Sequence, residues 1–170
     1  KRPFFTIEEM QVKMIDAWNA VVGKYDTVYV VGDFCFGKHL VWESILDQLK
    51  GNVTLIKGNH DRTKVIDRVK EDGFLEEIHT VGHLLKMDKY YLNITHYPME
   101  IGMRPFLFSI HGHIHNQHSS YINQINVGVD SPFMKLYYLR EHLPFGTPVS
   151  LEYLMKEIEK INHLLLEAKN

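Results

Sequence analysis

Four short apolar segments, rich in β-branched residues, each run into a loop whose side chains can bind a metal ion. Such segments predict buried strands, and loops that follow strands hold the functional sites of α/β proteins because the sheet fixes their anchors. In chain order the loops carry Asp33, then Asn59, His60 and Asp61, then His96, and finally the run from His111 to His115. The chain is therefore expected to form an α/β sheet with its chemistry at the strand ends.

Helical patterns separate the early strands. Thr6 followed by Glu9 predicts a capped helix start, and apolar residues at helical spacing continue it toward Gly23. Two further helices are predicted over 38 to 50 and 63 to 72, and a closing helix begins at Ser150. The expected strands cover 27 to 31, 53 to 56, a hairpin of 83 to 87 and 90 to 96, then 106 to 110 and 124 to 129. These elements predict one mixed-sheet domain over residues 1 to 170.

Composition narrows the function classes. The 170 residues are 45% hydrophobic and 24% charged, an ordinary globular balance, with no apolar run long enough for a membrane span. The net charge of −2 does not favour nucleic acid as a partner, although it leaves a nuclease open. The single cysteine, Cys35, favours a cytoplasmic location and is expected to be a small residue at the core edge.

The ligand types favour a transition metal. Imidazole nitrogen together with carboxylate and amide oxygen suits Mn, Fe, Zn or Ni. No cysteine cluster supports a structural zinc site, so the set is expected to be catalytic. His111, His113 and His115 share a period of two, which would place them on one face of an extended backbone. Of these, His111 is expected to be structural or to support a metal ligand, and His39 and His118 are expected at the surface.

In this order, the motifs resemble those of the calcineurin-like metallophosphoesterases, in particular the short bacterial and phage-type phosphoesterases. They are Gly32-Asp33, Gly58-Asn59-His60-Asp61, His96 and Gly112-His113-Ile114-His115, within a stretch from about Asp26 to Asp130. The resemblance implies a four-layer αββα sandwich, with two packed mixed β-sheets flanked by helices. It also implies two divalent transition-metal ions, with manganese favoured.

The resemblance also implies a role for each residue. Asp33 would bridge the two metals, the second metal would be completed by Asn59, His96 and His113, and His115 would bind the first metal. His60 would act on the scissile phosphate or its leaving group, and Asp61 would orient His60 by accepting its other ring proton. Arg62 is expected to meet substrate phosphate, and a solvated helix face is the alternative for it.

The family's first motif, an Asp-x-His after the first strand, has no counterpart before Asp33. We expect that motif and its strand upstream of Lys1. The alternative is a homologue with a single metal, or an inactive one.

The resemblance implies a metal-dependent phosphoesterase that hydrolyses a phosphodiester of small or nucleotide type. Hydroxide held between the two metals would attack phosphorus. The expected partner is a small phosphorylated substrate. The alternatives are a non-catalytic metal-binding scaffold module of the same fold and a metal-dependent nuclease.

Overall fold

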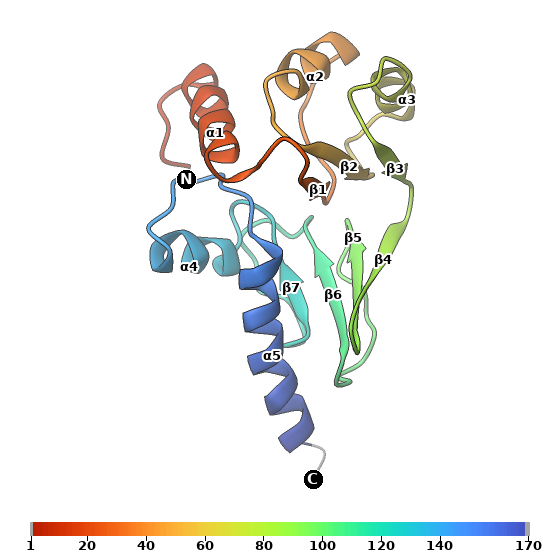
Figure 1. The fold of residues 1–170 in the computed structure, drawn as a ribbon, viewed down its shortest axis with the longest axis vertical. Helices are drawn as coiled ribbons and strands as arrows, with labels where there is room; N and C mark the ends of the chain where they lie inside the picture. Colours follow the sequence, from red (N-terminus) through yellow and green to blue (C-terminus); the bar gives the residue numbers. More distant parts are fainter. Residues whose placement is uncertain (1, 169–170) are drawn as a thin grey trace.

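Two β-sheets form the centre of the molecule, as seen in a computed structural model that describes residues 2–168 (Figure 1). The first sheet has the order β1-β2-β3 and the second the order β4-β5-β6-β7. Their strands are β1 (Thr27–Val30), β2 (Asn52–Ile56), β3 (Glu77–His79), β4 (Gly82–Met87), β5 (Tyr90–Thr95), β6 (Leu107–His111) and β7 (Gln124–Asn126). The predicted α/β fold with two sheets is confirmed.

One expectation about the sheets is wrong. Both pairs in the first sheet, β1 with β2 and β2 with β3, are parallel, so this sheet is not mixed within the described residues. The second sheet is mixed, because β4 and β5 form an antiparallel hairpin and β5-β6-β7 run parallel. The segment that joins each pair of parallel strands contains a helix or a long loop, because the chain must return to the start of the sheet before the next strand.

Within residues 2–168, five helices accompany the sheets: α1 (Ile7–Val21), α2 (His39–Leu46), α3 (Thr63–Glu71), α4 (Pro132–Arg140) and α5 (Leu151–Glu167). The Thr6 side chain accepts from Glu9 N at 3.0 Å, and the Ser150 side chain accepts from Tyr153 N, so both predicted helix starts are confirmed. Helix α2 ends four residues before the predicted end at 50. Strand β3 and helix α4 were not predicted, although Ser131 followed by Pro132 is a regular helix start.

Two apolar cores show how the layers stack. In one, Trp42, Leu55 and Ile66 lie between α1–α3 and one face of the first sheet. In the other, Ile56 and Tyr29 from the opposite face pack with strands of the second sheet and with α5. The order of layers is therefore helices, first sheet, second sheet, helix, and Figure 1 shows α1–α3 above the sheets with α5 running along the second sheet.

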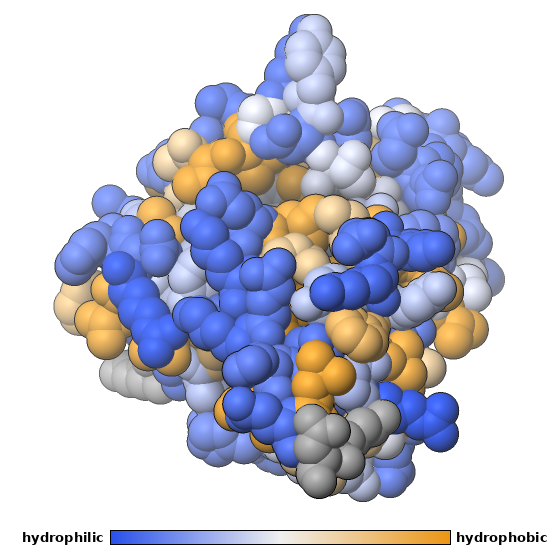
Figure 2. Space-filling view, turned by 60° about the horizontal axis from the view of Figure 1, so that its bottom comes forward, coloured by the Kyte–Doolittle hydropathy of each residue, from blue (hydrophilic) through white to orange (hydrophobic). Residues whose placement is uncertain are grey.

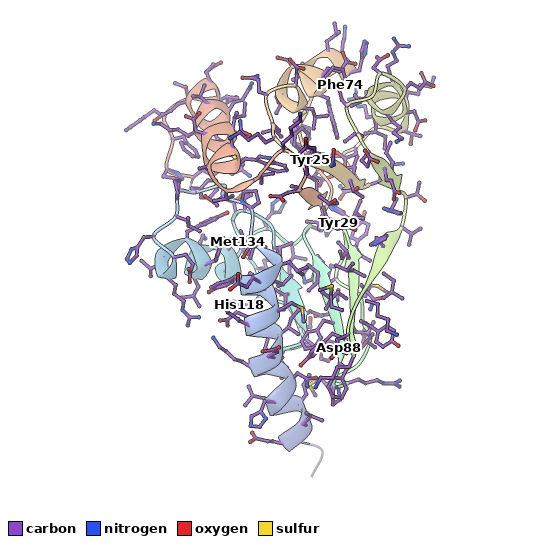
Figure 3. All side chains as sticks on the ribbon, in the orientation of Figure 1. Tyr25, Tyr29, Phe74, Asp88, His118 and Met134 are labelled. Atoms are coloured by element: carbon purple, nitrogen blue, oxygen red, sulfur yellow. The ribbon has the colours of Figure 1, made fainter. Side chains whose placement is uncertain are left out.

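Figure 3 labels residues at both ends of the second core. Tyr29 lies where the two sheets meet, and Asp88 lies at the far turn of the β4–β5 hairpin. Asp88 adopts a left-handed φ of 52°, so an aspartate fills the turn position for which glycine is usual.

The surface is mixed in polarity. Figure 2 views the molecule with its lower end forward, and hydrophilic side chains surround the apolar areas there. No helix within residues 2–168 is both long enough and apolar enough to cross a bilayer.

Candidate metal centre

The strand ends bring the predicted ligands to one place. Asp33 and Asn59 each lie three residues past the neighbouring parallel strands β1 and β2. His96 directly follows β5, and His113 lies two residues past β6, its parallel neighbour. Parallel neighbours end at the same edge of a sheet, so each sheet contributes one pair of ligands.

Four ligand atoms surround one point. The Nε2 atom of His96 lies 2.8 Å from Asn59 Oδ1, 3.1 Å from His113 Nδ1 and 3.5 Å from Asp33 Oδ2. The ligand atoms of Asp33, His96 and His113 all lie within 4.8 Å of one another. This group could hold a metal ion, and His96, at 1% exposure, anchors it from the core.

The chemistry of these atoms fits a cation. The Nδ1 atom of His96 lies 2.7 Å from the carbonyl oxygen of Val31, so it carries the proton and donates it there. The Nε2 atom then presents a lone pair toward the amide oxygen of Asn59 and the carboxyl group of Asp33, both of which are acceptors that a cation can join. Desolvation lowers the pKa of His113, and the nearby His96 adds to that effect, which favours the neutral imidazole that a metal requires.

Asp61 does not have its predicted role. Within the described residues its carboxylate accepts from the backbone N–H groups of Gly58 at 2.8 Å, Asp33 at 2.9 Å and Phe34 at 3.3 Å, and not from the His60 ring. At 2% exposure, the buried carboxylate is satisfied by these donors. Asp61 therefore positions the two ligand loops instead of the histidine.

The loops that carry Asp33 and Asn59 are in close contact at two glycines, Gly32 and Gly58. A Cβ added at Gly58 would lie 2.5 Å from Asp33 N, and a Cβ added at Gly32 would lie 2.6 Å from Gly58 Cα. Gly32 also has φ of +86°, which side chains rarely adopt. The close approach of the Gly32 and Gly58 backbones lets the loops share hydrogen bonds.

His60 is exposed beside the cluster. Its backbone N–H donates to Asp33 Oδ1 at 2.8 Å, which holds His60 next to a metal ligand. Its ring lies 5.3 Å from the ring of Phe36, centroid to centroid. Arg62 is the residue that precedes the first turn of α3, and its exposed side chain lines a small pocket that His60 also lines.

His115 lies outside the cluster formed by the other ligands in the described chain. His113 and His115 have φ of 62° and 49°, so the backbone is not extended and the expected shared face of the three histidines is wrong. His111 is fully buried, with its ring nitrogens 2.9 Å from Gly112 O and 3.0 Å from Ser119 Oγ. Its structural role is confirmed, and His118 is exposed as expected.

Sequence reasoning did not assign three neighbours of the site. The ring of Tyr97 lies 4.4 Å from that of His113 and 4.9 Å from that of His96, against the metal cluster. Phe36 and Lys38 line the pocket beside His60. Their positions in the sequence could have indicated them, because all three lie within five residues of a predicted ligand or at a helix start.

Known proteins provide two comparisons. No model of a known protein family matches this chain. The crystal structure of the protein of unknown function AQ665 from Aquifex aeolicus is similar in fold, with a TM-score of 0.57, 24% identity, and coverage of 75% of this chain and 80% of that chain. The uncharacterized protein MJ1445 of Methanocaldococcus jannaschii is 31% identical over an alignment of 169 residues, and the match covers 94% of this chain and 81% of MJ1445. The chain belongs to the same protein family as MJ1445.

Proposed function

We propose that the protein is a metal-dependent phosphoesterase of the calcineurin-like type that hydrolyses a phosphodiester of small or nucleotide type. The observation that carries this proposal is the convergence of Asp33, Asn59 and His113 on His96 Nε2, with His60 on the rim of the same site. Structural metal sites have closed shells, often of cysteine. A site made of histidine, amide and carboxylate beside an exposed imidazole is typical of hydrolysis.

The cluster would hold one divalent transition-metal ion, with manganese favoured. Asp33 and His115 would contribute to a second ion. When bound, such ions neutralise the phosphoryl oxygens and lower the pKa of a coordinated water.

The chain's own residues supply positioning and a proton. The Asp61 carboxylate positions Asp33 by accepting a hydrogen bond from the Asp33 backbone N–H. The Asp33 carboxylate positions His60 by accepting a hydrogen bond from the His60 backbone N–H. The imidazole of His60 can then donate a proton to the leaving oxygen, because it is exposed beside the ligands.

Hydrolysis of bis-p-nitrophenyl phosphate with added Mn²⁺ tests the proposal. We expect metal-dependent turnover that falls by about 100-fold or more in His60→Ala. His118→Ala is the matched control, because that imidazole is exposed and is not a ligand. If the protein binds metal but none of Mn, Fe, Zn or Ni supports turnover, the proposal is wrong.

A non-catalytic metal-binding module is the second candidate. It is favoured by the observation that the described chain gathers ligands for one ion and keeps His115 apart. The same assay distinguishes the two, because a module would bind metal without metal-dependent turnover of the diester.

A further inference from the structure

The small pocket that His60 and Arg62 line adjoins the candidate metal centre. It has a volume of about 210 Å³ and lies between the first turns of α2 and α3. His60 lines it, together with the side chains of Phe36, Lys38, Trp42 and Arg62. The pocket therefore shares His60 with the metal centre but none of the four ligands that converge on His96 Nε2.

The lining of this pocket is cationic. Lys38 and Arg62 are both exposed, and neither forms an ion pair with any residue from 2 to 168. Among the residues that the structure describes, no aspartate or glutamate lines the pocket. The other ionisable groups that line it are the His60 imidazole and the Cys35 thiol, and burial raises the pKa of that thiol to about 12. Two unneutralised positive charges facing one cavity favour an anionic ligand.

The two helix starts add to the positive potential. Lys38 and Arg62 are the N-cap residues of α2 and α3, where serine, threonine, aspartate or asparagine is preferred. Neither side chain caps its helix, and neither helix has an acidic residue in its first turn. A cation at the positive end of a helix is unfavourable, and here it occurs twice at one pocket. A bound anion would remove this conflict at both helices.

We propose that the pocket between α2 and α3 binds a second phosphate group of the substrate, carried on the part that leaves beside His60. The pocket is smaller than the roughly 300 Å³ at which sites for whole small molecules begin, so it fits one group. Two cations match a phosphate dianion better than a carboxylate. Phe36, at 76% exposure, offers an apolar surface in this pocket, and its ring lies 5.3 Å from the His60 ring, centroid to centroid.

The assignment to substrate rests on the proposed phosphoesterase function, whereas the anion site does not. Inorganic phosphate titrated in the presence of a chelator tests the site alone, because no metal is available to hold it. At about pH 8 phosphate is mostly a dianion. We expect amide NMR shifts at residues 36 to 41 and 60 to 65, with an affinity that falls about tenfold or more in Lys38→Gln/Arg62→Gln.

The matched control is Lys24→Gln/Arg104→Gln, which removes the same charges from exposed positions outside the pocket. Thermal unfolding of both variants confirms that each is folded. Unchanged phosphate affinity in Lys38→Gln/Arg62→Gln, or phosphate shifts elsewhere in the wild type, would overturn the anion site whether or not the protein hydrolyses diesters.

A pair of dinucleotides tests the assignment to substrate. The dinucleotides pTpT and TpT differ only in a terminal phosphate, and we expect kcat/KM to favour pTpT by about tenfold or more. The preference should disappear in Lys38→Gln/Arg62→Gln and persist in the control variant. Equal rates for pTpT and TpT would overturn the substrate assignment, whereas failure to hydrolyse TpT, pTpT and bis-p-nitrophenyl phosphate would count against the phosphoesterase function itself.

Discussion

Asp61 and Asp33 tie together two loops that lie 28 positions apart in the chain: the Asp61 carboxylate accepts the Asp33 backbone N–H at 2.9 Å. The Asp33 carboxylate in turn accepts the His60 N–H at 2.8 Å. Each of the two loops therefore donates a backbone N–H to a carboxylate of the other loop. Because Asp33 and Asn59 approach His96 from these loops, these hydrogen bonds set the geometry of the candidate metal centre.

Asp61→Asn is expected to weaken this tie. The amide replaces one acceptor oxygen with a donor that faces backbone N–H groups, so at least one of the three hydrogen bonds is lost. We expect the free energy of unfolding to fall by about 2–3 kcal/mol, measured by urea denaturation. Affinity for Mn²⁺, measured by calorimetry, should fall about tenfold. Asp67→Asn, at an exposed position on α3, should leave both quantities unchanged.

Gly58→Ala tests the close approach of the loops. The new methyl group would overlap the backbone of Asp33, so we expect a loss of about 3 kcal/mol in the free energy of unfolding. Gly73→Ala is the control, because its φ of +86° is strained for alanine but nothing lies within 4 Å of the added carbon. That control should lose only about 1 kcal/mol. Equal losses in the two variants would show that the loop contact is unimportant.

His113→Ala removes a candidate metal ligand without emptying the core. We expect the dissociation constant for Mn²⁺ to rise by more than the roughly 10- to 100-fold caused by losing a supporting residue. His96→Ala should have the same effect on metal binding and also lower stability, because His96 is 1% exposed. His118→Ala, with its exposed ring, should bind metal as the wild type does. Wild-type affinity in His113→Ala would disprove the assignment of this ligand.

Cys35 is expected to be chemically inert in the folded protein. Burial raises the pKa of its thiol from 9.0 to about 12, and the Asp61 carboxylate adds to the shift. At pH 8 the folded protein should therefore react slowly with a thiol reagent, and urea should restore a fast reaction. Cys35→Ser should keep diester hydrolysis, and a large loss of turnover would contradict the absence of a thiol nucleophile.

The same shift has a consequence for stability at high pH. The unfolded thiol ionises near 9 while the folded thiol stays protonated up to about 12, so the unfolded state binds fewer protons in that window. The contribution of Cys35 to stability is therefore complete below pH 9 and is lost as the pH rises toward 12. In Cys35→Ser, unfolding measured between pH 8 and 10.5 should show a weaker fall in stability.

Local patterns predicted most of the elements. Thr6 and Ser150 cap helices with their own side chains, so both helix starts can be predicted from nearby residues. The apolar strand segments can likewise be predicted from the residues within them. Strand β3 was not predicted because three residues are too few to show a period-two pattern of apolar side chains. It is a strand because it pairs with β2, which is distant in the sequence. Helix α4 was missed because tyrosines and leucines are spread around it without one clear apolar face.

The sequence by itself determined which residue types stand at the strand ends, and therefore that Asp33, Asn59, His96 and His113 are available as ligands. Only the tertiary structure decided which atoms meet. The Asp61 carboxylate accepts from the Asp33 loop and not from the His60 ring, and His113 joins the cluster of ligand atoms whereas His115 does not. Lys38 and Arg62 share a pocket because α2 and α3 follow adjacent parallel strands. Contacts between residues this far apart in the chain depend on sheet order and loop path, which local sequence patterns do not encode.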